Sequence, residues 1–556
     1  MTHPFVPVDA HLARLAASQP DTPALHIPLG RGRHHSPTFA ELNALVDRFT
    51  TSLQALGLVR GERLALMVPP CEEFFALTFA ALRGGFVPVL IDPGMGRKNL
   101  GRCLAEADVA AFLGVPKAIL ARILFGWCPS ARISVTVGRR RWFGTTTTDR
   151  FRFVPPLPKP ETFGPEDPAA ILFTSGSTGL AKGVPYSHGT FAAQVEMLKA
   201  MYGIESGEVD WCSFPLFALF GPALGMTCVI PEMNASKPAT VNPETARKQI
   251  RDFGVTNLFG SPAVIRRLAL DHDPESYRTV RRVLSAGAPA RTDVLEAMQK
   301  QLPAGVQVFT PYGATESLPV ANIGSAEILG ETAALTAVGR GVCIGRPAPG
   351  VTVRIIRIDD DMIETWADEL LVKPGEIGEF VVESAVTTTE YFRRPGAAAF
   401  AKIRGPLGVV HHRMGDVGYV DDAGRLWFCG RKSQRVVTPM RTYFTDCVEP
   451  IFNAIQGVER TALVGVSVRS RLGGLPPAAR RGIFDPVLCV ELKRDAVWRI
   501  IEPKLQEVGT PLGIRRFLKH PRFPVDVRHN SKIFREKLAV WAAGRLGIPE
   551  SAPHRV

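Results

Sequence analysis

The stretch that decides the fold of this chain reads Thr174-Ser175-Gly176-Ser177-Thr178-Gly179-Leu180-Ala181-Lys182-Gly183. An apolar run at 169–173 precedes it and predicts a buried strand, and apolar residues at Phe191, Val195 and Leu198 follow at helical spacing. The glycines let the backbone approach a ligand closely, while hydroxyl groups, backbone N–H groups and the lysine suit phosphate oxygens. The stretch is not a Walker A loop, because no glycine directly precedes the lysine and no Ser or Thr follows it. We therefore predict a strand, a phosphate-binding loop and a helix; a flexible turn is the alternative.

The rest of the chain is organised as α/β structure followed by a strand-rich part. Apolar runs at 64–68 and 87–91 alternate with helical patterns such as 39–56, which is typical of α/β layers. Strand patterns dominate after about Val338, and Gly430-Arg431 forms the natural boundary to a compact basic segment of ordinary domain size. The expected fold class is α/β (mixed α+β), with a large N-terminal domain, 1–430, and a small C-terminal α+β domain, 431–556.

Length and composition exclude several classes of protein. A chain of 556 residues with 46% hydrophobic and 21% charged residues indicates a globular protein of two or more domains. Nine cysteines without a CxxC or Cys/His cluster favour reduced thiols and a cytoplasmic location over a disulfide framework or a zinc site. The N-terminus lacks a signal-peptide pattern. The apolar stretch 74–91 is broken by Arg83, two glycines and Pro88, so it predicts a buried helix and a strand rather than a membrane span.

The net charge of +13 makes anionic partners worth considering. No nucleic-acid-binding module is recognisable, so nucleic acid is not expected as a partner. The segment 120–143 combines apolar residues, two tryptophans and three consecutive arginines at 139–141. Such a segment could lie at a lipid interface or dock a protein partner, and a solvated surface excursion is the plainer alternative. The adjacent His411 and His412 are expected as a surface pair rather than a metal site, because neighbours on a strand point to opposite faces.

Five motifs together resemble the adenylate-forming superfamily of acyl-CoA synthetases, luciferases and peptide-synthetase adenylation domains. The 174–183 stretch is similar to that family's phosphate loop. The others follow in the family's order: Pro311-Tyr312-Gly313-Ala314-Thr315-Glu316, Arg413-Met414-Gly415-Asp416, Gly430-Arg431 and Asn530-Ser531-Lys532-Ile533. The resemblance covers nearly the whole chain. It implies an ATP-dependent, AMP-forming enzyme in which domain 1–430 binds ATP and the acyl substrate, and a mobile domain, 431–556, carries the catalytic lysine.

The resemblance implies a role for each matching residue. The expected catalytic residues are Lys532 beside the attacking carboxylate, Thr315 on the α-phosphate, Glu316 as the Mg²⁺ ligand, and Lys182. The expected nucleotide-binding residues are Thr174, Ser175, Gly176, Ser177, Thr178 and Gly179 on the phosphates, Tyr312 with Ala286, Gly287 and Ala288 on adenine, Asp416 on both ribose hydroxyls, and Arg431. Each residue alone is consistent with an ordinary surface or core position. The occurrence of all the motifs in the family's order favours a nucleotide-binding active site.

The sequence departs from ordinary CoA ligases at two places, and these departures indicate which members of the superfamily it resembles most. The loop after Gly430-Arg431 carries Pro439 and Met440 where such ligases keep glycines along the pantetheine path, which argues against thioester formation. Slippage of the alignment in a variable loop is the alternative. Ala218 stands where a His is common, which would widen an apolar acyl pocket. The expected substrate-binding residues are Phe217, Ala218, Phe259, Gly260 and Gly313.

The segment 214–220, the segment 312–320 with Leu318-Pro319-Val320, and the altered loop after Gly430-Arg431 together resemble one subfamily, the β-lactone synthetases of olefin biosynthesis. That resemblance implies adenylation of a long-chain 2-alkyl-3-hydroxy fatty acid, attack of its 3-hydroxyl on the acyl-adenylate, and release of a β-lactone, AMP and pyrophosphate. ATP and Mg²⁺ are the implied cofactors. The implied partners are the pathway reductase, thiolase and β-lactone decarboxylase. The basic segment 120–143 could then serve peripheral membrane contact or assembly with these partners. A long-chain acyl-CoA or acyl-carrier ligase is the alternative, and a nucleotide-binding sensor is a third. The sequence identifies no base for the cyclisation.

Overall fold

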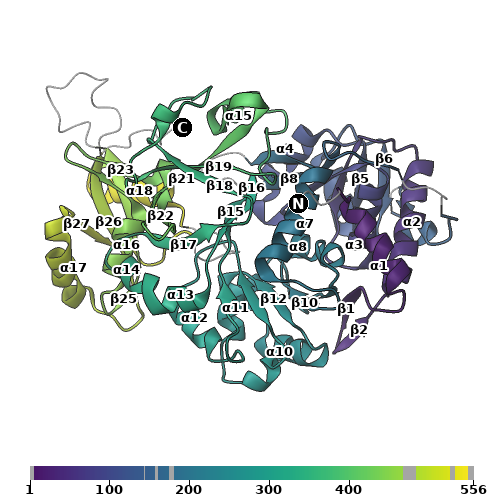
Figure 1. Ribbon diagram of the computed structural model, residues 1–556, viewed down its shortest axis with the longest axis horizontal. Helices are drawn as coiled ribbons and strands as arrows, with labels where there is room; N and C mark the ends of the chain where they lie inside the picture. The colour runs from purple at the N-terminus through teal and green to yellow at the C-terminus, as the bar shows by residue number, and fades with distance from the viewer. Residues whose placement is uncertain are drawn as a thin grey trace.

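The computed structural model describes residues 5–142, 144–156, 161–174, 181–467, 484–525 and 533–548. Three large sheets with flanking helices form a large N-terminal domain, and a three-stranded sheet with its own helices forms a small C-terminal α+β domain. Figure 1 shows the N-terminal elements (purple) at one end of the molecule and the C-terminal elements (yellow) at the other. This mixed α/β architecture confirms the predicted fold class; the boundary after Gly430 stays a prediction.

The first sheet contains the strands on either side of the 174–183 stretch. Its described strands pair in parallel except the last two, which are antiparallel. Strands of a parallel sheet that is covered on both faces carry apolar side chains on both sides. The apolar runs of this sequence at 64–68 and 87–91 fit this arrangement. In spatial order they are β7 (Thr146–Thr147), β6 (Ile133–Thr136), β5 (Ala111–Gly114), β3 (Arg63–Met67), β4 (Val87–Ile91), β8 (Pro168–Thr174) and β9 (Lys182–Ser187). The associated helices are α1 (Val8–Ser18), α2 (Phe39–Ala55), α3 (Glu72–Arg83), α4 (Arg97–Ala107), α5 (Pro116–Phe125), α6 (Thr148–Phe151) and α7 (His188–Tyr202).

The second sheet is also parallel, apart from a hairpin at one edge. Its strands in spatial order are β14 (Val308–Phe309), β13 (Arg282–Ser285), β12 (Asn257–Gly260), β10 (Val209–Cys212), β11 (Thr227–Val229), β1 (Leu25–Gly30) and β2 (Arg33–His35). Its helices are α8 (Pro215–Ala218), α9 (Gly221–Leu224), α10 (Pro243–Asp252), α11 (Pro262–Leu268) and α12 (Thr292–Gln299). The carboxyl ends of β12, β13 and β14 therefore share one edge of this sheet.

The third sheet is antiparallel and joins the two parallel sheets to the C-terminal domain. Its strands in spatial order are β15 (Tyr312–Ala314), β16 (Ser317–Asn322), β17 (Val342–Pro347), β22 (Leu426–Arg431), β21 (Val410–Val420), β19 (Gly378–Glu383) and β18 (Thr352–Ile356), and β20 (Lys402–Arg404) pairs with β21. Its helices are α13 (Ser325–Glu327), α14 (Ala333–Ala337) and α15 (Pro395–Ala401). The expected strand-rich character of the chain after Val338 is confirmed.

The C-terminal domain packs around its own apolar core, which includes Phe452, Leu463, Leu488 and Leu505. A separate core is what allows a segment of this size to behave as a domain. Its elements are β23 (Val436–Val437), β24 (Thr442–Tyr443), α16 (Thr445–Asn453), β25 (Val458–Ser467), β26 (Phe484–Leu492), α17 (Trp498–Leu512), β27 (Arg516–Lys519) and α18 (Arg535–Arg545). Arg291 of the large domain lies 3.5 Å from Glu459 of this domain.

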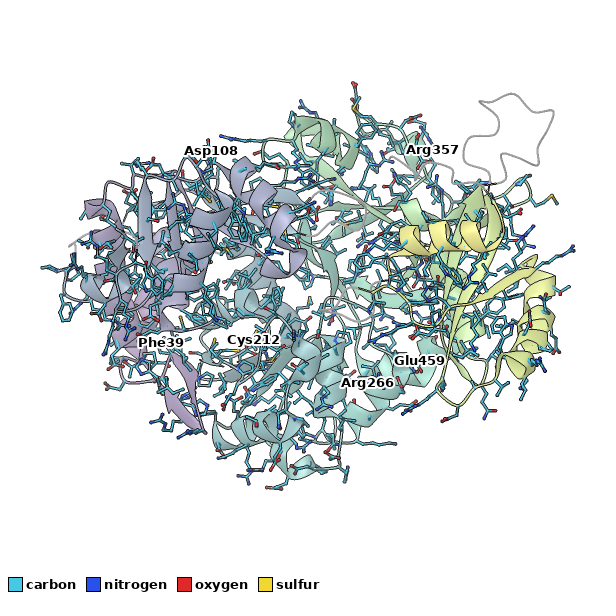
Figure 2. All side chains as sticks on the ribbon, turned by 180° about the vertical axis from the view of Figure 1, so that it is seen from behind. Phe39, Asp108, Cys212, Arg266, Arg357 and Glu459 are labelled. Carbon is cyan, nitrogen blue, oxygen red and sulfur yellow. The ribbon has the colours of Figure 1, made fainter. Side chains whose placement is uncertain are left out.

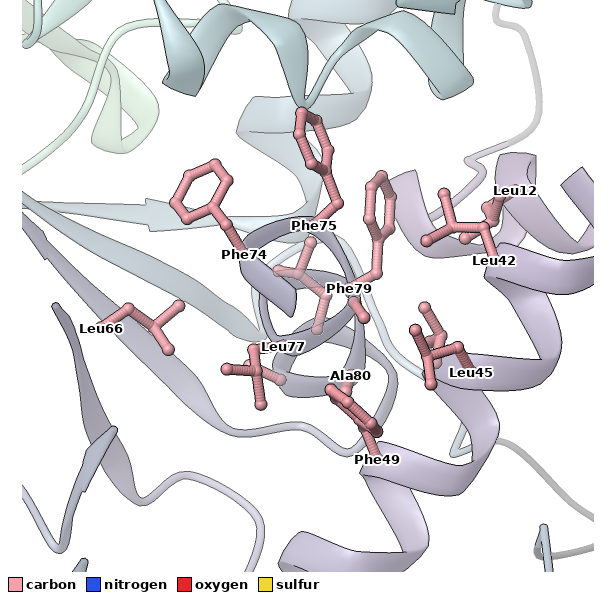
Figure 3. Packing of buried hydrophobic residues seen from close by; sticks show 14 of the residues in the cluster. Leu12, Leu42, Leu45, Phe49, Leu66, Phe74, Phe75, Leu77, Phe79 and Ala80 are labelled. Atoms are coloured by element: carbon pink, nitrogen blue, oxygen red, sulfur yellow. The ribbon is translucent and has the colours of Figure 1, made fainter. Parts of the chain in front are cut away.

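The largest apolar cluster lies between α1, α2, α3 and the first two sheets. Figure 3 shows α3 at its centre, with Phe79 directed toward Leu42 of α2. All residues from Phe74 to Arg83 are buried, and β4 follows, so the predicted buried helix and strand at 74–91 are confirmed. None of the helices in the described part of the chain combines the length and hydrophobicity that crossing a bilayer requires.

One local prediction was wrong. His411 and His412 are both buried rather than exposed, because β21 is an interior strand with both faces covered. His411 packs against the Trp366 ring at 4.5 Å, and Nδ1 of His412 lies 3.1 Å from the carbonyl oxygen of Ala401. In the described residues no group of three or more His, Cys, Asp or Glu side chains is arranged to hold a metal ion.

Candidate active site

The carboxyl ends of β12, β13 and β14 bring the expected adenine-binding residues to one edge of the second sheet. Gly260 pairs with Ser285, and the N–H of Ala286 donates to the Gly260 carbonyl at 3.0 Å. Gly287 has φ of +94°, a backbone conformation that glycine adopts without strain. Ligands of parallel α/β sheets bind at this kind of edge. The buried hydroxyl of Ser285 finds no hydrogen-bond partner among the described residues, so a polar group is available here.

Asp416, which is buried, and the partly buried Tyr312 and Arg431 form one cluster next to that edge. The Tyr312 hydroxyl donates to Asp416 Oδ2 at 2.5 Å, and Arg431 Nη1 lies 2.7 Å from Asp416 Oδ1. The cluster follows from strand pairing, because Asp416 on β21 is in register with Arg431 at the end of β22. The structure thus brings together three residues that the sequence assigned to the same nucleotide.

Burial is the largest influence on the pKa of Asp416. It raises the pKa of Asp416 above its usual range, whereas the Arg431 guanidinium opposes that shift. Asp446, near the start of α16 in the C-terminal domain, adds a second negative charge that raises the pKa of Asp416 further. Asp446 was missed by the sequence analysis. The available signal was its position shortly after the loop that carries Pro439 and Met440. At Asp416, the residue expected to bind the ribose, the two domains therefore interact electrostatically.

Glu316 is held in place by residues from elsewhere in the chain. The Tyr391 hydroxyl donates to Glu316 Oε1 at 2.7 Å, and the N–H of Thr388 donates to the Glu316 carbonyl oxygen at 2.8 Å. No described residue donates a hydrogen bond to the second carboxylate oxygen, Oε2. One fixed and one available oxygen suit a Mg²⁺ ion, which takes one or two protein carboxylates together with phosphate oxygens and water. The residues present therefore fit a Mg²⁺ ligand at Glu316.

The backbone of the segment around Glu316 is fixed on both sides. The Tyr186 hydroxyl donates to the carbonyl oxygen of Thr315 at 2.5 Å, and the Gln194 amide donates to that of Leu318 at 2.9 Å. At Gly313 a Cβ atom would lie 2.9 Å from the Ser317 carbonyl oxygen, so the turn requires glycine. Each carbonyl is held by a residue that is distant in sequence, which explains why the motif alone does not reveal its supports.

Two lysines lie over the ring of Tyr391. Lys182 Nζ is 4.5 Å from the ring centroid and Lys402 Nζ is 5.8 Å from it. Lys402 donates to the carbonyl oxygen of Thr388. Burial lowers the pKa of Lys402 to about 7, with Lys182 adding to the shift and Glu316 opposing it. Burial also lowers the pKa of Lys182, again against the attraction of Glu316.

Tyr391, Thr388 and Lys402 were missed by the sequence analysis. The available signal for Lys402 was its place at the end of an apolar run, Ala397–Ile403, where a charged side chain is unusual. For Tyr391 and Thr388 the sequence holds no comparable signal, because their contacts with Glu316 arise only from folding. They complete a cationic and hydrogen-bonding environment beside the 174–183 stretch.

The start of the C-terminal domain packs tightly against the large domain. Gly430 has φ of +136°, and a Cβ atom there would lie 2.4 Å from Thr445 Oγ1 on α16. Within the C-terminal domain, Arg535 of α18 pairs with Glu449 of α16 at 2.6 Å. In the loop between β23 and β24, the side chain of Met440 is 90% exposed, so it fills no interior space in this arrangement.

Aromatic rings line the segment expected to bind the acyl chain. Phe217 of α8 stacks on Phe259 of β12 with ring centroids 4.5 Å apart, and Phe214 and Phe220 lie 5.3 Å and 6.5 Å from Phe217. Ala218 is fully buried in the main apolar cluster, and its carbonyl oxygen accepts a bond from the Cys228 thiol. An apolar surface of this kind suits an aliphatic substrate.

Some expected residues lie outside the described part of the chain. These are Ser175, Gly176, Ser177, Thr178, Gly179 and Lys532. Of Thr174 the structure describes the backbone, which ends β8 and pairs with Lys182 of β9. The predicted strand before the stretch and helix after it are confirmed as β8 and α7, while the roles of the individual site residues stay predictions.

Comparisons with known proteins agree with this geometry. The family model described as AMP-binding enzyme matches residues 12–392. An olefin β-lactone synthetase from Stenotrophomonas maltophilia is 46% identical over 97% of this chain and 98% of its own length. A second olefin β-lactone synthetase, from Xanthomonas campestris pv. campestris, is 46% identical over 96% and 97%. Among solved structures, o-succinylbenzoate CoA synthetase from Bacillus subtilis, in complex with its acyl-adenylate intermediate, aligns with a TM-score of 0.73 and 19% identity over 99% of both chains. That last similarity shows the fold.

Proposed function

Because this chain belongs to the family of AMP-binding enzymes, we propose that it activates a long-chain 2-alkyl-3-hydroxy fatty acid with ATP and closes it to a β-lactone. It is an AMP-forming ligase of the β-lactone synthetase type. The observation that carries this function is the 46% identity to two olefin β-lactone synthetases over nearly the full length of each. The long-chain acyl-CoA ligase considered from the sequence is not favoured.

The first half-reaction joins the fatty acid to AMP. A carboxylate oxygen of the acid attacks the α-phosphorus of ATP, and the bond to pyrophosphate breaks. Lys182 and the 174–179 residues hold the leaving phosphates, and Lys532 stabilises negative charge that develops between the carboxylate and the α-phosphate. Glu316 would hold Mg²⁺ when that ion is present, and the ion would supply positive charge to the phosphates. Asp416, Tyr312 and Arg431 fix the nucleoside, so the reaction relies on positioning and electrostatics.

The second half-reaction closes the ring. The 3-hydroxyl oxygen attacks the acyl-adenylate carbonyl carbon, the bond from that carbon to the AMP oxygen breaks, and the hydroxyl proton passes to a base or to water. The nucleophile is part of the substrate, so tethering replaces binding of a second reactant. The Phe217–Phe259 stack and its neighbouring rings support binding of the alkyl chains. A CoA path is not required, which agrees with Pro439 and Met440 in the loop after β23.

The proposal extends to neighbouring enzymes in olefin biosynthesis. A thiolase and a reductase would supply the 2-alkyl-3-hydroxy acid, and a β-lactone decarboxylase would convert the product to an olefin. These enzymes are proposed partners, together with peripheral contact of the chain with a membrane. The similarity to the two olefin β-lactone synthetases supports a fatty-acid substrate.

Product analysis by NMR tests this function directly. The protein is incubated with ATP, Mg²⁺ and a synthetic 2-alkyl-3-hydroxy fatty acid, with and without CoA. We expect a β-lactone and AMP in equal amounts in both reactions. A thioester that forms only when CoA is present would instead make the chain an acyl-CoA ligase and would overturn the interpretation of the 439–440 loop.

A further inference from the structure

Helix α5 exposes its apolar side instead of burying it. Of its ten residues only Ile119 is buried. The exposed fractions of Leu120, Ile123, Leu124 and Phe125 are 37%, 52%, 68% and 48%. The first three are spaced at i, i+3 and i+4 and therefore share one face. A helix that covers a sheet normally turns such a face inward, so these four residues, here called the α5 ridge, indicate an interaction surface.

Helix α4 carries cationic side chains, and that of Arg97 lies beside the α5 ridge. The Arg97 guanidinium lies 5.5 Å from the centroid of the Phe125 ring. The chain just after α5 packs closely against α4, because a Cβ atom on Gly101 of α4 would lie 2.8 Å from the indole nitrogen of Trp127. Lys98 and Arg102 are exposed on the same helix. In the described part of the chain none of these three cations forms an ion pair, so their charges are available to a partner.

The net charge of this region matches an anionic partner. Residues 97–142 contain nine Lys and Arg but only two Asp and Glu, so this short region contributes +7 of the chain's net +13. Both acids face other cations: Glu106 pairs with Arg394 and Asp108 with Arg393. An apolar ridge bordered by unpaired cations is the pattern of a helix that lies in the interface of an anionic membrane.

We propose that the α5 ridge and the cations of α4 bind the surface of an anionic lipid membrane. The ridge enters the boundary between headgroups and acyl chains, and Arg97, Lys98 and Arg102 contact headgroup phosphates. This inference rests on the proposed function, since a long-chain hydroxy acid and its β-lactone both partition into lipid. Docking there gives the enzyme access to substrate that is dissolved in the bilayer.

The position of α5 keeps a membrane bound there away from the C-terminal domain. It connects β5 and β6 of the first sheet, which Figure 1 shows at the end of the molecule opposite β27 and α17. In the reverse view of Figure 2, Asp108 at the end of α4 and Glu459 at the start of β25 likewise lie far apart. Membrane contact at α5 is therefore compatible with movement of the C-terminal domain.

Vesicle flotation of the full-length protein tests the proposal. The probes are vesicles of phosphatidylcholine alone and of phosphatidylcholine with phosphatidylglycerol. We expect binding to the anionic vesicles that weakens as salt increases, and little binding to the neutral ones. The double variant Ile123→Gln/Leu124→Gln should bind about tenfold or more weakly, because it removes two apolar anchors while keeping helix propensity. Lys98→Gln/Arg102→Gln should weaken binding and reduce its salt dependence.

Matched controls separate the surface from general effects. Ile500→Gln replaces a residue that is 61% exposed on α17, and Arg499→Gln/Lys504→Gln removes two exposed cations from the same helix. These variants should bind vesicles like the wild type. Absent binding, or equal loss in the α5 and α17 variants, would overturn the proposal. If light scattering shows a changed molecular mass for the Ile123→Gln/Leu124→Gln variant alone, the ridge is a protein interface and the proposal is also overturned. β-Lactone formation from a short-chain substrate without vesicles reports separately on the proposed function.

Discussion

At the scale of single residues, the orientation of Glu316 depends on one hydroxyl group. Tyr391 donates to Glu316 Oε1 and leaves Oε2 for the cation. A hydrogen bond to a charged group contributes about 1.5–3 kcal/mol. Tyr391→Phe removes only that bond. We expect the Mg²⁺ concentration needed for half-maximal ATP binding, measured by calorimetry, to rise about tenfold, with little change at saturating Mg²⁺.

Tyr186→Phe is the matched control for this prediction. It removes a hydroxyl that donates to the backbone of the same segment, at the Thr315 carbonyl oxygen, without contact to the carboxylate. It should lower stability without a comparable shift in the Mg²⁺ requirement. If both variants shift the Mg²⁺ requirement equally, Tyr391 has no specific role in orienting Glu316.

Lys402 makes stability depend on pH in a defined direction. Its pKa in the folded protein is about 7, below the value of about 10.4 in an unfolded chain. Between these values the unfolded chain binds more protons, so wild-type stability rises with pH. Lys402→Met keeps the volume but removes this dependence. The unfolding free energy of the variant minus that of the wild type should therefore fall by about 2 kcal/mol from pH 7 to pH 9.

Chemical denaturation at several pH values measures this difference. The loss of the Lys402 bond to Thr388 affects the variant at every pH, so the test uses the slope and not the absolute value. A difference that is constant with pH would mean that Lys402 keeps an ordinary pKa and that its burial is relieved by water.

At the scale of elements, Gly430 determines how β22 continues into the C-terminal domain. A side chain there meets Thr445 Oγ1 and also forces a positive φ on a non-glycine residue. Gly430→Ala should destabilise the contact of α16 with the large domain by about 1–3 kcal/mol and slow the overall reaction. Calorimetric unfolding and steady-state rates measure the two effects.

Gly424→Ala separates strain from steric contact. Gly424 also has a positive φ, +73°, but a Cβ atom there would meet nothing within 4 Å. This variant should show only the cost of the backbone conformation and should leave the reaction rate unchanged. Equal rates for the two variants would mean that the approach of Thr445 to Gly430 is not important for the reaction.

Elements with strong local patterns could be predicted from the sequence. The helix expected at 39–56 is α2, and its start is marked by Thr38 and Glu41, which form a capping box. The strand at 87–91 is β4, since a continuous apolar run must be buried on both faces. His411 and His412 were misplaced because polarity alone does not reveal whether a strand lies inside a sheet. Tyr391 could not be found, because its contact with Glu316 arises only when the chain folds. For Lys402 the charge at the end of an apolar run was a signal, but it did not reveal the partner, Thr388.

At the scale of the whole molecule, the C-terminal domain is expected to supply Lys532 to the first half-reaction. Lys532→Ala should reduce pyrophosphate release at least a hundredfold, because a preorganised charge at the transition state is lost. ATP binding by calorimetry should change little, since the residues proposed to bind the nucleoside, Tyr312, Asp416 and Arg431, do not include Lys532. Pyrophosphate release at the wild-type rate would remove Lys532 from the mechanism.

The measurement that tests the central claim most directly follows ¹⁸O from the substrate into the products. The 2-alkyl-3-hydroxy fatty acid is labelled with ¹⁸O in its carboxylate and incubated with ATP and Mg²⁺ in the absence of CoA, and mass spectra of AMP and of the lactone are recorded. If the carboxylate is adenylated and the 3-hydroxyl then closes the ring, one ¹⁸O atom appears in AMP and the lactone keeps the other in its carbonyl group. Unlabelled AMP together with a lactone that carries both ¹⁸O atoms would show that the hydroxyl is activated instead, and would contradict the account.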